Sequence, residues 1–506
     1  MTGDRSTLTT ADGESTTLAS LRAFGRSRLG IDPRALAAFR IGLGLVVLCD
    51  LLFLRVPGLA TFYTDEGVLP RSALAEASPT LATWSLHALS GSVWLQALLV
   101  AIAGGAAACL LVGYRHRLAA VVSALLLASL FARNPYLVNG GDTILLSLLV
   151  LAATLPLERR WSLRPRRFAD KRSDPIDSRD DPRVVSAATA TVLLHVAVIY
   201  LLNAVLKFRS DAWMSATAVR RIFHLQDFVF LLGPTAAEYP ALLTAVNWLW
   251  IAVLSMSPLL VLATGRLRIA TVGAFVGAHL GMAATMRLGA FPFVMIAALL
   301  LFLPPQLWDP IDEFVSRTAS GRRLEALATS RDEGGTGPRD FLGAPRVRRG
   351  IRLGTTVLFA CVLLSVVSWQ VTAAGLVDTG PTPGGEKLGS ASWAFFAPDP
   401  PDEYSWYVVE AERESGAPID LVDGGTVDFD RPPDAMDRYP SALWKRYGTK
   451  LRGGSGDAHL DPAAAYFCDR APDDIESVTI YRVDQSVDAD GPVGEPVPHE
   501  RISASC

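Results

Sequence analysis

Lysine is rare in this chain, and one lysine stands at the end of a long apolar segment. Lysine and arginine together number 47, and only five of them are lysines: Lys171, Lys207, Lys387, Lys445 and Lys450. Lys207 closes the run VVSAATATVLLHVAVIYLLNAVLK, whereas the other four lie in polar stretches. Arginine stays charged in proteins, but a lysine withdrawn from water can lose its proton and act as a base. Lys207 is therefore a candidate general base, and the alternative is an ammonium group that extends to the lipid headgroups.

Other titratable side chains also lie within apolar segments, where a charge is costly and a functional role is the default hypothesis. They are Arg40, Asp50, Asp142, His195 and His279. Each also has a structural explanation. Arg40 and Asp50 would have partners on other helices, each histidine would form a hydrogen bond between helices, and Asp142 would cap a helix after a glycine-rich turn.

The apolar segments predict an all-α polytopic membrane bundle with about nine transmembrane helices. They are residues 35–56, 92–114, 117–134, 137–156, 184–206, 241–264, 267–286, 289–305 and 351–373. With a cytoplasmic N-terminus, the inward segments and their flanks carry 27 lysines and arginines and the outward segments carry eight. This asymmetry follows the positive-inside rule, so we expect a multi-pass protein of the cell membrane.

This topology places four titratable side chains, Asp50, Asp142, Lys207 and His279, in the outer half of the bilayer. It also divides the chain into five parts. These are a cytoplasmic N-terminal tail (1–29), a membrane domain (30–305), a cytoplasmic linker (306–350), a last transmembrane helix (351–373) and an extracytoplasmic domain (374–506).

The region from residue 374 onward differs in composition from the membrane segments. It has 25 acidic and 11 basic residues, a net charge of −14, and strand-like runs at 405–412 and 478–483. We therefore expect a mostly β, acidic extracytoplasmic domain whose surface stays hydrated. Cys468 and Cys506 both lie in it, and their spacing leaves open whether they form a disulfide.

Composition also argues against several classes of function. The net charge of the whole chain is −3, which suggests no nucleic-acid partner. Neither a CxxC motif nor a cysteine–histidine spacing of a metal site occurs, so we predict no metal. The first 20 residues have no apolar core and do not resemble a signal peptide.

Five stretches resemble a known family. GIDPRALAAFRIGLGLVVLCDLL (30–52) with FYTDEGVLP (62–70) resembles the HTTM family, the membrane domain shared with vitamin K-dependent gamma-carboxylases. YLLNAVLKFRSDAW (200–213) resembles the carboxylase segment that carries a lysine base, and HLGMAATMRLGAFPFVMIA (279–297) resembles a stretch from a membrane histidine to a Phe-Pro pair. SWAFFAPDP (392–400) resembles the start of the outer domain in bacterial and archaeal relatives.

The resemblance implies a specific chemistry. The lysine that matches Lys207 would deprotonate reduced vitamin K or a menaquinol, which reacts with oxygen to give a strong base. That base would take a proton from the gamma carbon of a glutamyl side chain, and carbon dioxide would add to the carbanion, a reaction of the lyase class. His279 would assist Lys207. Asp50, Asp142 and Phe291 are our candidates for quinone binding, although Phe291 could also anchor the chain at the membrane interface.

One departure from the family pattern separates the lysine chemistry from the carboxylation. Pro135 stands where carboxylases have a histidine, so one polar partner of the lysine is missing. The leading hypothesis is a carboxylase-like membrane enzyme that uses a quinol. The alternative is a non-catalytic HTTM protein that binds lipid or quinone, or aids maturation or export, with its outer domain binding a protein or peptide. A transporter is the third hypothesis, although no internal repeats support it.

Overall fold

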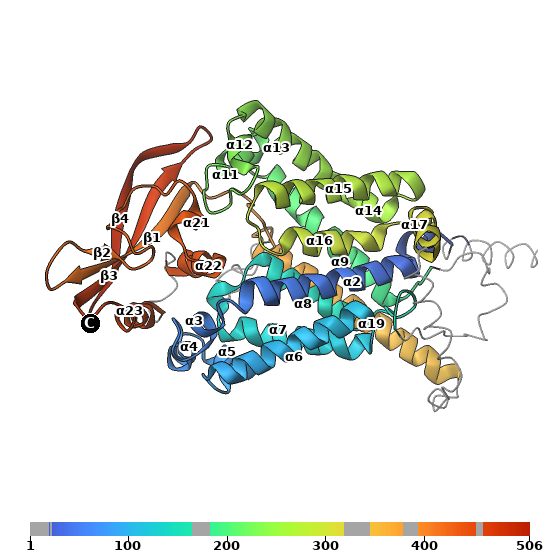
Figure 1. Cartoon of the computed structure of the whole chain (residues 1–506). Helices are drawn as coiled ribbons and strands as arrows, with labels where there is room; N and C mark the ends of the chain where they lie inside the picture. The colour runs from blue at the N-terminus through green and yellow to red at the C-terminus, as the bar shows by residue number, and fades with distance from the viewer. Residues whose placement is uncertain (1–19, 21–22, 164–182, 318–344, 378–392, 452–458) are drawn as a thin grey trace, which may run out of the picture.

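The computed structural model describes residues 20, 23–163, 183–317, 345–377, 393–451 and 459–506. Within these residues the chain is mostly helical up to residue 377, and a small antiparallel sheet with three helices follows from residue 403 onward. Figure 1 shows the helices gathered in one body and the sheet at one end of it. The prediction of a helical bundle followed by a β-containing region is confirmed at this level.

Six helices in the described part of the chain are long and apolar enough to cross a membrane. Their lengths of 18 residues or more match the roughly 20 residues that a bilayer requires. They are α2 (Pro33–Cys49) with the π-helical turn Asp50–Arg55, α6 (Val93–Val112), α7 (His116–Arg133), α9 (Ala187–Phe208), α15 (Gly265–Thr285) and α19 (Pro345–Ala373).

The other three predicted spans correspond to shorter or broken helices. They are α8 (Gly140–Ala152), α13 (Pro240–Ser255) with α14 (Ser257–Leu262), and α16 (Phe291–Leu299) with the 3-10 turn Leu300–Phe302. Between residues 302 and 305 the chain bends by 102° into α17 (Pro305–Arg317). Counting this bent pair as one span gives up to seven, so nine spans remain a prediction.

Short helices cover the end of the bundle that faces the sheet (Figure 1). One group follows α2 in the sequence, another follows α9, and a single 3-10 turn follows α7. They are α3 (Leu59–Tyr63), α4 (Arg71–Ala77), α5 (Pro79–Trp84), α10 (Asp211–Met214), α11 (Ala218–Ile222) and α12 (Gly233–Ala237), with 3-10 turns at Leu86–Ala88 and Pro135–Leu137.

The C-terminal region contains a four-stranded antiparallel sheet in the order β2-β1-β3-β4. β1 (Glu403–Arg413) and β3 (Ile475–Val487) contain the two strand-like runs seen in the sequence, and β2 (Ile419–Asp420) and β4 (Pro492–Ser505) flank them. Three helices that the sequence did not suggest pack beside the sheet: α21 (Ala435–Arg438), α22 (Ala442–Leu451) and α23 (Leu460–Cys468). A disulfide joins Cys468 to Cys506 and ties the end of β4 to α23.

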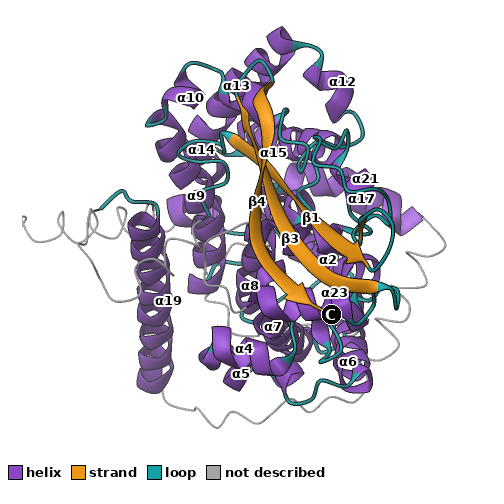
Figure 2. Cartoon of the chain, turned by 90° about the vertical axis from the view of Figure 1, so that its left-hand side faces the viewer, coloured by secondary structure: helices purple, strands orange, loops and turns teal. Residues whose placement is uncertain are grey.

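Helix α22 docks the sheet region onto the short helices that cover this end of the bundle. The rings of Trp444 and Phe62 pack edge to face at 5.1 Å, and the Tyr447 hydroxyl donates to the backbone carbonyl of Val68 at 3.2 Å. Tyr447 is fully buried, and that burial raises its pKa far above the usual range, so it stays a neutral donor. Figure 2 shows the sheet lying across one end of the helices, with α19 standing to one side.

Candidate functional site

Lys207 lies at the C-terminal end of α9, where the helix meets the C-terminal region. Its side chain is only 2 % exposed. Nζ donates to the backbone carbonyl of Phe395 at 2.7 Å and to Asn203 Oδ1 at 3.5 Å, and it lies 4.4 Å from the centre of the Trp213 ring. Among the described residues, no carboxylate lies within ion-pair distance of Nζ. A buried amine with neutral partners is the arrangement expected of a lysine that gains and loses a proton.

The backbone partner of Lys207, Phe395, comes from the segment 393–401, which precedes β1 and which we call the strap. Three side chains of α9 and α10 hold its backbone. Asn203 Nδ2 donates to the carbonyl of Trp393 at 2.7 Å, Lys207 donates to that of Phe395, and Trp213 Nε1 donates to that of Phe396 at 2.8 Å. The strap therefore forms one wall of the site, although it lies about 190 residues from α9 in the sequence.

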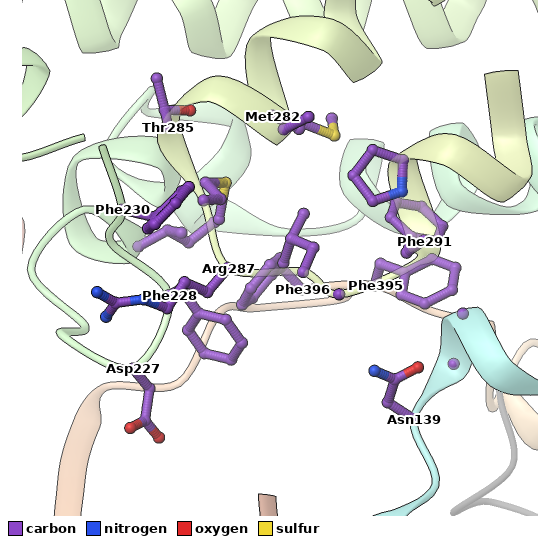
Figure 3. A pocket seen from close by; sticks show the side chains of 18 of the residues that line it. Asn139, Asp227, Phe228, Phe230, Met282, Thr285, Arg287, Phe291, Phe395 and Phe396 are labelled. Atoms are coloured by element: carbon purple, nitrogen blue, oxygen red, sulfur yellow. The ribbon is translucent and has the colours of Figure 1, made fainter. Parts of the chain in front are cut away.

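The strap also holds one residue in an uncommon backbone conformation. Phe396 has φ of +50°, a region that a bulky side chain rarely adopts. Its ring packs edge to face on Phe228 at 4.9 Å, while the ring of Phe395 lies 4.4 Å from that of Phe291. Figure 3 shows Phe395 beside Phe291 and Phe396 beside Phe228 at the edge of the pocket. The strained backbone turns both carbonyls toward α9 and α10 and both rings toward the pocket.

The pocket beside Lys207 is a cavity of about 1960 Å³, well above the roughly 300–1,000 Å³ of common small-molecule sites. Its apolar walls are the facing sides of α2, α13, α15 and α16. Its other end lies under the C-terminal region, where α22 contributes one helix face. Lining residues with polar side chains include Asp50, Asn139, Tyr200, Asn203, Lys207, Asp227, Arg287, Glu403, Lys445, Arg446 and Arg482. A long apolar compartment next to a polar one suits an amphiphilic molecule.

His279, the second candidate catalytic residue, lies in α15 and is fully buried. Its Nδ1 is 2.8 Å from the Phe275 carbonyl, which can only accept, so Nδ1 carries the proton. Its Nε2 lies 3.4 Å from the Tyr200 hydroxyl, and its ring packs against Trp250 and Phe291. His279 is not among the lining residues, whereas Tyr200, Trp250 and Phe291 are. The structure thus places it behind the cavity wall, in the position of a hydrogen bonder between helices.

Asp50 and Asp142 meet at a buried arginine that the sequence analysis missed. Arg55 Nε lies 3.0 Å from Asp50 and Arg55 Nη2 lies 3.2 Å from Asp142, and its Nη1 donates to Tyr63 at 3.0 Å. The spacing of five residues between Asp50 and Arg55 suits the π-helical turn and not an α-helix, so helical periodicity concealed the pair.

A second arginine reaches this cluster from the C-terminal region. Arg446 of α22 lies 3.3 Å from Asp142, and it also donates to the backbone carbonyl of Leu137 at 3.3 Å. Asp142 also accepts from the backbone of Asn139 in a capping box, as its cap explanation anticipated. Both carboxylates thus have ion-pair partners, and only Asp50 of the two lines the cavity.

The structure also shows the contacts of the remaining residues that the sequence singled out. Phe291 lines the cavity beside Phe395. Arg40 donates to the carbonyls of Leu110 and Leu111 at the end of α6, and His195 lies 3.0 Å from Ser147 Oγ, so both have partners on other helices. At the departure from the carboxylase pattern, Tyr136 and not the preceding proline lines the cavity.

Ion pairs between loops of the bundle and the C-terminal region also join these two parts of the chain. Arg287, in the loop between α15 and α16, forms a two-pronged pair with Asp434 at 2.6 and 2.8 Å. The Arg287 guanidinium lowers the pKa of the Asp434 carboxyl below its ordinary value of 3.8. Arg287 lines the cavity, so this pair helps to close its polar end.

Comparisons with known proteins identify one family. The HTTM domain model matches residues 29–308, which is more than half of the chain and includes α2 to α16. No curated protein and no solved structure matches significantly. The matched range contains Lys207, His279, Asp50, Asp142 and Phe291, whereas the strap and α22 lie outside it.

Proposed function

This chain belongs to the HTTM domain family, and within that family we propose that it is a membrane enzyme that binds a lipophilic quinol and deprotonates it with Lys207. One observation carries the proposal. Lys207 is 2 % exposed, has no carboxylate partner among the described residues, and lines a cavity of about 1960 Å³. Arginine predominates among the basic residues, but only lysine can act as a base, so its presence here fits proton transfer.

The walls of the cavity suit a quinol better than a purely aliphatic lipid. Near Lys207 the cavity is bordered by flat aromatic side chains, namely Tyr200, Trp213, Phe291, Phe395 and Phe396. Aromatic rings stack favourably on one another, so a quinol ring would pack there with a hydroxyl directed at Lys207. In the reaction the O–H bond of the quinol breaks, its electron pair stays on oxygen, and Nζ gains the proton. The Trp213 ring face, 4.4 Å away, would stabilise the ammonium that results.

The opposite part of the cavity suits a long hydrocarbon tail. Its walls include Leu45 of α2, Phe53 of the π-helical turn that follows α2, Leu249 of α13 and Phe293 of α16, which are 52 %, 79 %, 63 % and 51 % exposed. In a bilayer such apolar side chains face lipid. The tail would therefore enter from the side of the bundle while the ring reaches the aromatic compartment.

For the topology we propose nine spans, a cytoplasmic N-terminus and an extracytoplasmic C-terminal domain. The positive-inside asymmetry supports this orientation. The disulfide between Cys468 and Cys506 also supports it, because disulfides persist in oxidising compartments outside the cytoplasm. The quinol reaction would then take place near the outer leaflet, beneath the C-terminal domain.

The test is quinol-dependent oxygen uptake by the full-length protein in proteoliposomes. A quinolate reacts with dioxygen more readily than a quinol does, and the reaction yields quinone and hydrogen peroxide. With menaquinol as the probe, Lys207→Ala should abolish the protein-dependent uptake, and added methylamine should restore part of it. Arg209→Ala is the matched control, because Arg209 is an exposed basic residue at the same helix end that does not line the cavity. Full uptake in Lys207→Ala would refute the proposal.

A second candidate function rests on the hydrogen bond from Lys207 to the Phe395 carbonyl at 2.7 Å. In this reading the protein binds lipid or quinone without chemistry, or assists maturation or export, and Lys207 only clamps the strap. Arginine also donates to carbonyls but does not release its proton at physiological pH. Lys207→Arg should therefore keep the function if Lys207 is a clamp and lose it if Lys207 is a base.

The finer possibility of glutamyl carboxylation is part of the family resemblance. Its test is incorporation of labelled carbonate into a Glu-containing peptide in the same proteoliposomes. Oxygen uptake without incorporation of the label would support deprotonation of the quinol by Lys207 and would refute glutamyl carboxylation.

A further inference from the structure

We propose that Asn203 is a positioning residue that, together with the backbone carbonyl of Phe395, aims the Lys207 amine at the cavity. This inference rests on the proposed function of Lys207 as a base. Asn203 and Lys207 are four residues apart on α9, so their side chains lie on the same face of the helix. Asn203 is 5 % exposed and lines the same cavity.

The orientation of the Asn203 amide is fixed by its neighbours. Its Nδ2 donates to the carbonyl of Ile199 at 2.9 Å and to that of Trp393 at 2.7 Å. Backbone carbonyls only accept, so the amide nitrogen must face them. The amide oxygen is then directed at Nζ of Lys207, 3.5 Å away.

Two fixed acceptors define the geometry of a neutral lysine. An uncharged amine has two N–H groups and one lone pair, in tetrahedral arrangement. The Phe395 carbonyl and Asn203 Oδ1 would each accept one N–H, at 2.7 and 3.5 Å. The lone pair then takes the remaining direction on a nitrogen whose side chain lines the cavity. A base whose lone pair already points at the substrate avoids a reorientation cost in each turnover.

The identity of the residue fits this role. An aspartate at this position would pair with the ammonium form of Lys207 and oppose release of the proton. It would also place an anion against the carbonyls of Ile199 and Trp393, which need a donor. An apolar residue would leave the amine free to rotate. Only a neutral side chain that both donates and accepts satisfies the three neighbours.

The experiment compares Asn203→Leu and Asn203→Asp in the menaquinol-dependent oxygen uptake assay with the full-length protein in proteoliposomes. Misplacement of a reacting group can cost on the order of 10²-fold in rate, so we expect kcat to fall by about that factor. KM should change by less than about threefold, because the substitution leaves unchanged the aromatic side chains and the part of the cavity that would hold the hydrocarbon tail. Thermal unfolding shows which variant remains folded, and Asn203→Asp preserves shape if Asn203→Leu does not fold.

A double-mutant cycle separates positioning from a structural effect. The cycle is measured with methylamine present, because Lys207→Ala without it has no protein-dependent uptake. If Asn203 acts only through the Lys207 amine, Asn203→Leu should change the methylamine-rescued uptake of Lys207→Ala by less than about twofold. Gln370→Leu is the matched control, because Gln370 Oε1 accepts from the Trp393 backbone at 2.9 Å and Gln370 does not line the cavity. It should leave kcat within about twofold of the wild type.

The outcomes that overturn the inference differ from those that overturn the proposed function. Unchanged kcat in both Asn203 variants, independent losses in the double mutant, or an equal loss in Gln370→Leu would each refute a positioning role. Lys207 would remain the base in those cases. Retained uptake in Lys207→Ala would instead refute the base itself.

Discussion

Substitution of Arg446 by methionine tests whether the C-terminal region completes a buried charge cluster in the bundle. Asp50 and Asp142 supply two negative charges, and Arg55 and Arg446 supply two positive charges. Arg446→Met keeps most of the apolar side chain and leaves a net charge of −1 among groups whose side chains are 1 % exposed in the bundle. Because Asp142 and Arg55 are so fully withdrawn from water, we expect the imbalance to be costly.

The magnitude follows from the remaining partners of Asp142. Breaking a buried ion pair by removing one partner costs about 3–5 kcal/mol. Asp142 would keep Arg55 at 3.2 Å and the backbone of Asn139 at 3.0 Å, and Arg446 itself is 15 % exposed. We therefore expect the lower end, about 3 kcal/mol of unfolding free energy. The measurement is unfolding of the solubilised protein by SDS titration, followed by tryptophan fluorescence.

The control and the rescue make the prediction refutable. Arg413→Met removes an arginine of the same region that pairs with Asp474 at 3.5 Å where both side chains are partly exposed, at 34 % and 46 %. Such a pair contributes about 0–1 kcal/mol, so Arg413→Met should have little effect. Asp142→Asn added to Arg446→Met restores neutrality and should recover at least half of the loss. If Arg446→Met costs no more than Arg413→Met, or if Asp142→Asn only adds to the damage, the charge-balance argument is wrong.

Two further predictions concern the part of the cavity that would hold a hydrocarbon tail and the docking of the C-terminal region on the bundle. Gly281 lines the cavity and a Cβ there meets no atom within 4 Å, so Gly281→Leu should fold normally, weaken binding of long-tailed menaquinone, and spare binding of a tail-less naphthoquinone. Gly104→Leu is the control in the binding assays, because Gly104 has the same open surroundings but does not line the cavity. If Gly281→Leu bound both quinones with equal affinity, the hydrocarbon tail would not lie in this part of the cavity. Arg287 lowers the pKa of Asp434, so the stability from this pair is present above the ordinary carboxyl value of 3.8 and is lost as pH falls through the lower folded-state value. Protease protection of the docked region should therefore drop at that acidic step in the wild type, and Asp434→Asn should remove the step.

Much of the helical arrangement could be predicted from the sequence because apolar length and charge asymmetry act locally. Each of the nine predicted segments corresponds to a helix or a broken helix, and the two strand-like runs lie in β1 and β3. The burial of Lys207 was also foreseeable, since a lone lysine ended an apolar run. The shorter helices begin at Asn139-Gly140-Gly141 or at prolines, where local breakers shorten a segment that hydropathy alone extends.

The contacts that define the site could not be predicted, because they join distant parts of the chain. No local signal tells that the carbonyl of Phe395 meets Lys207, 188 residues away. The pair of Asp50 and Arg55 depends on a π-helical turn, which helical periodicity does not anticipate. Arg446 completes the cluster from α22, in a region for which the sequence suggested strands and no helices.

The basic residues of the C-terminal region have contacts that its composition alone does not predict. Residues 374–506 have 25 acidic and 11 basic residues, which predicts a hydrated acidic surface. Four of those basic side chains donate to backbone carbonyls of the bundle: Arg431 to His224, Lys445 to Asp227, Arg446 to Leu137 and Arg470 to Glu66. Carbonyls in loops and at helix ends lack intrahelical donors and accept such side chains readily.

Four of the eleven basic residues of this acidic region thus lie where it meets the bundle. Two of them, Lys445 and Arg446, also line the cavity, and the strap of the same region supplies two of its aromatic walls. The matched family range ends at residue 308, before either feature. The HTTM bundle by itself would therefore leave the cavity open and Lys207 without its Phe395 partner. The C-terminal region is therefore part of the cavity wall and not an appended module.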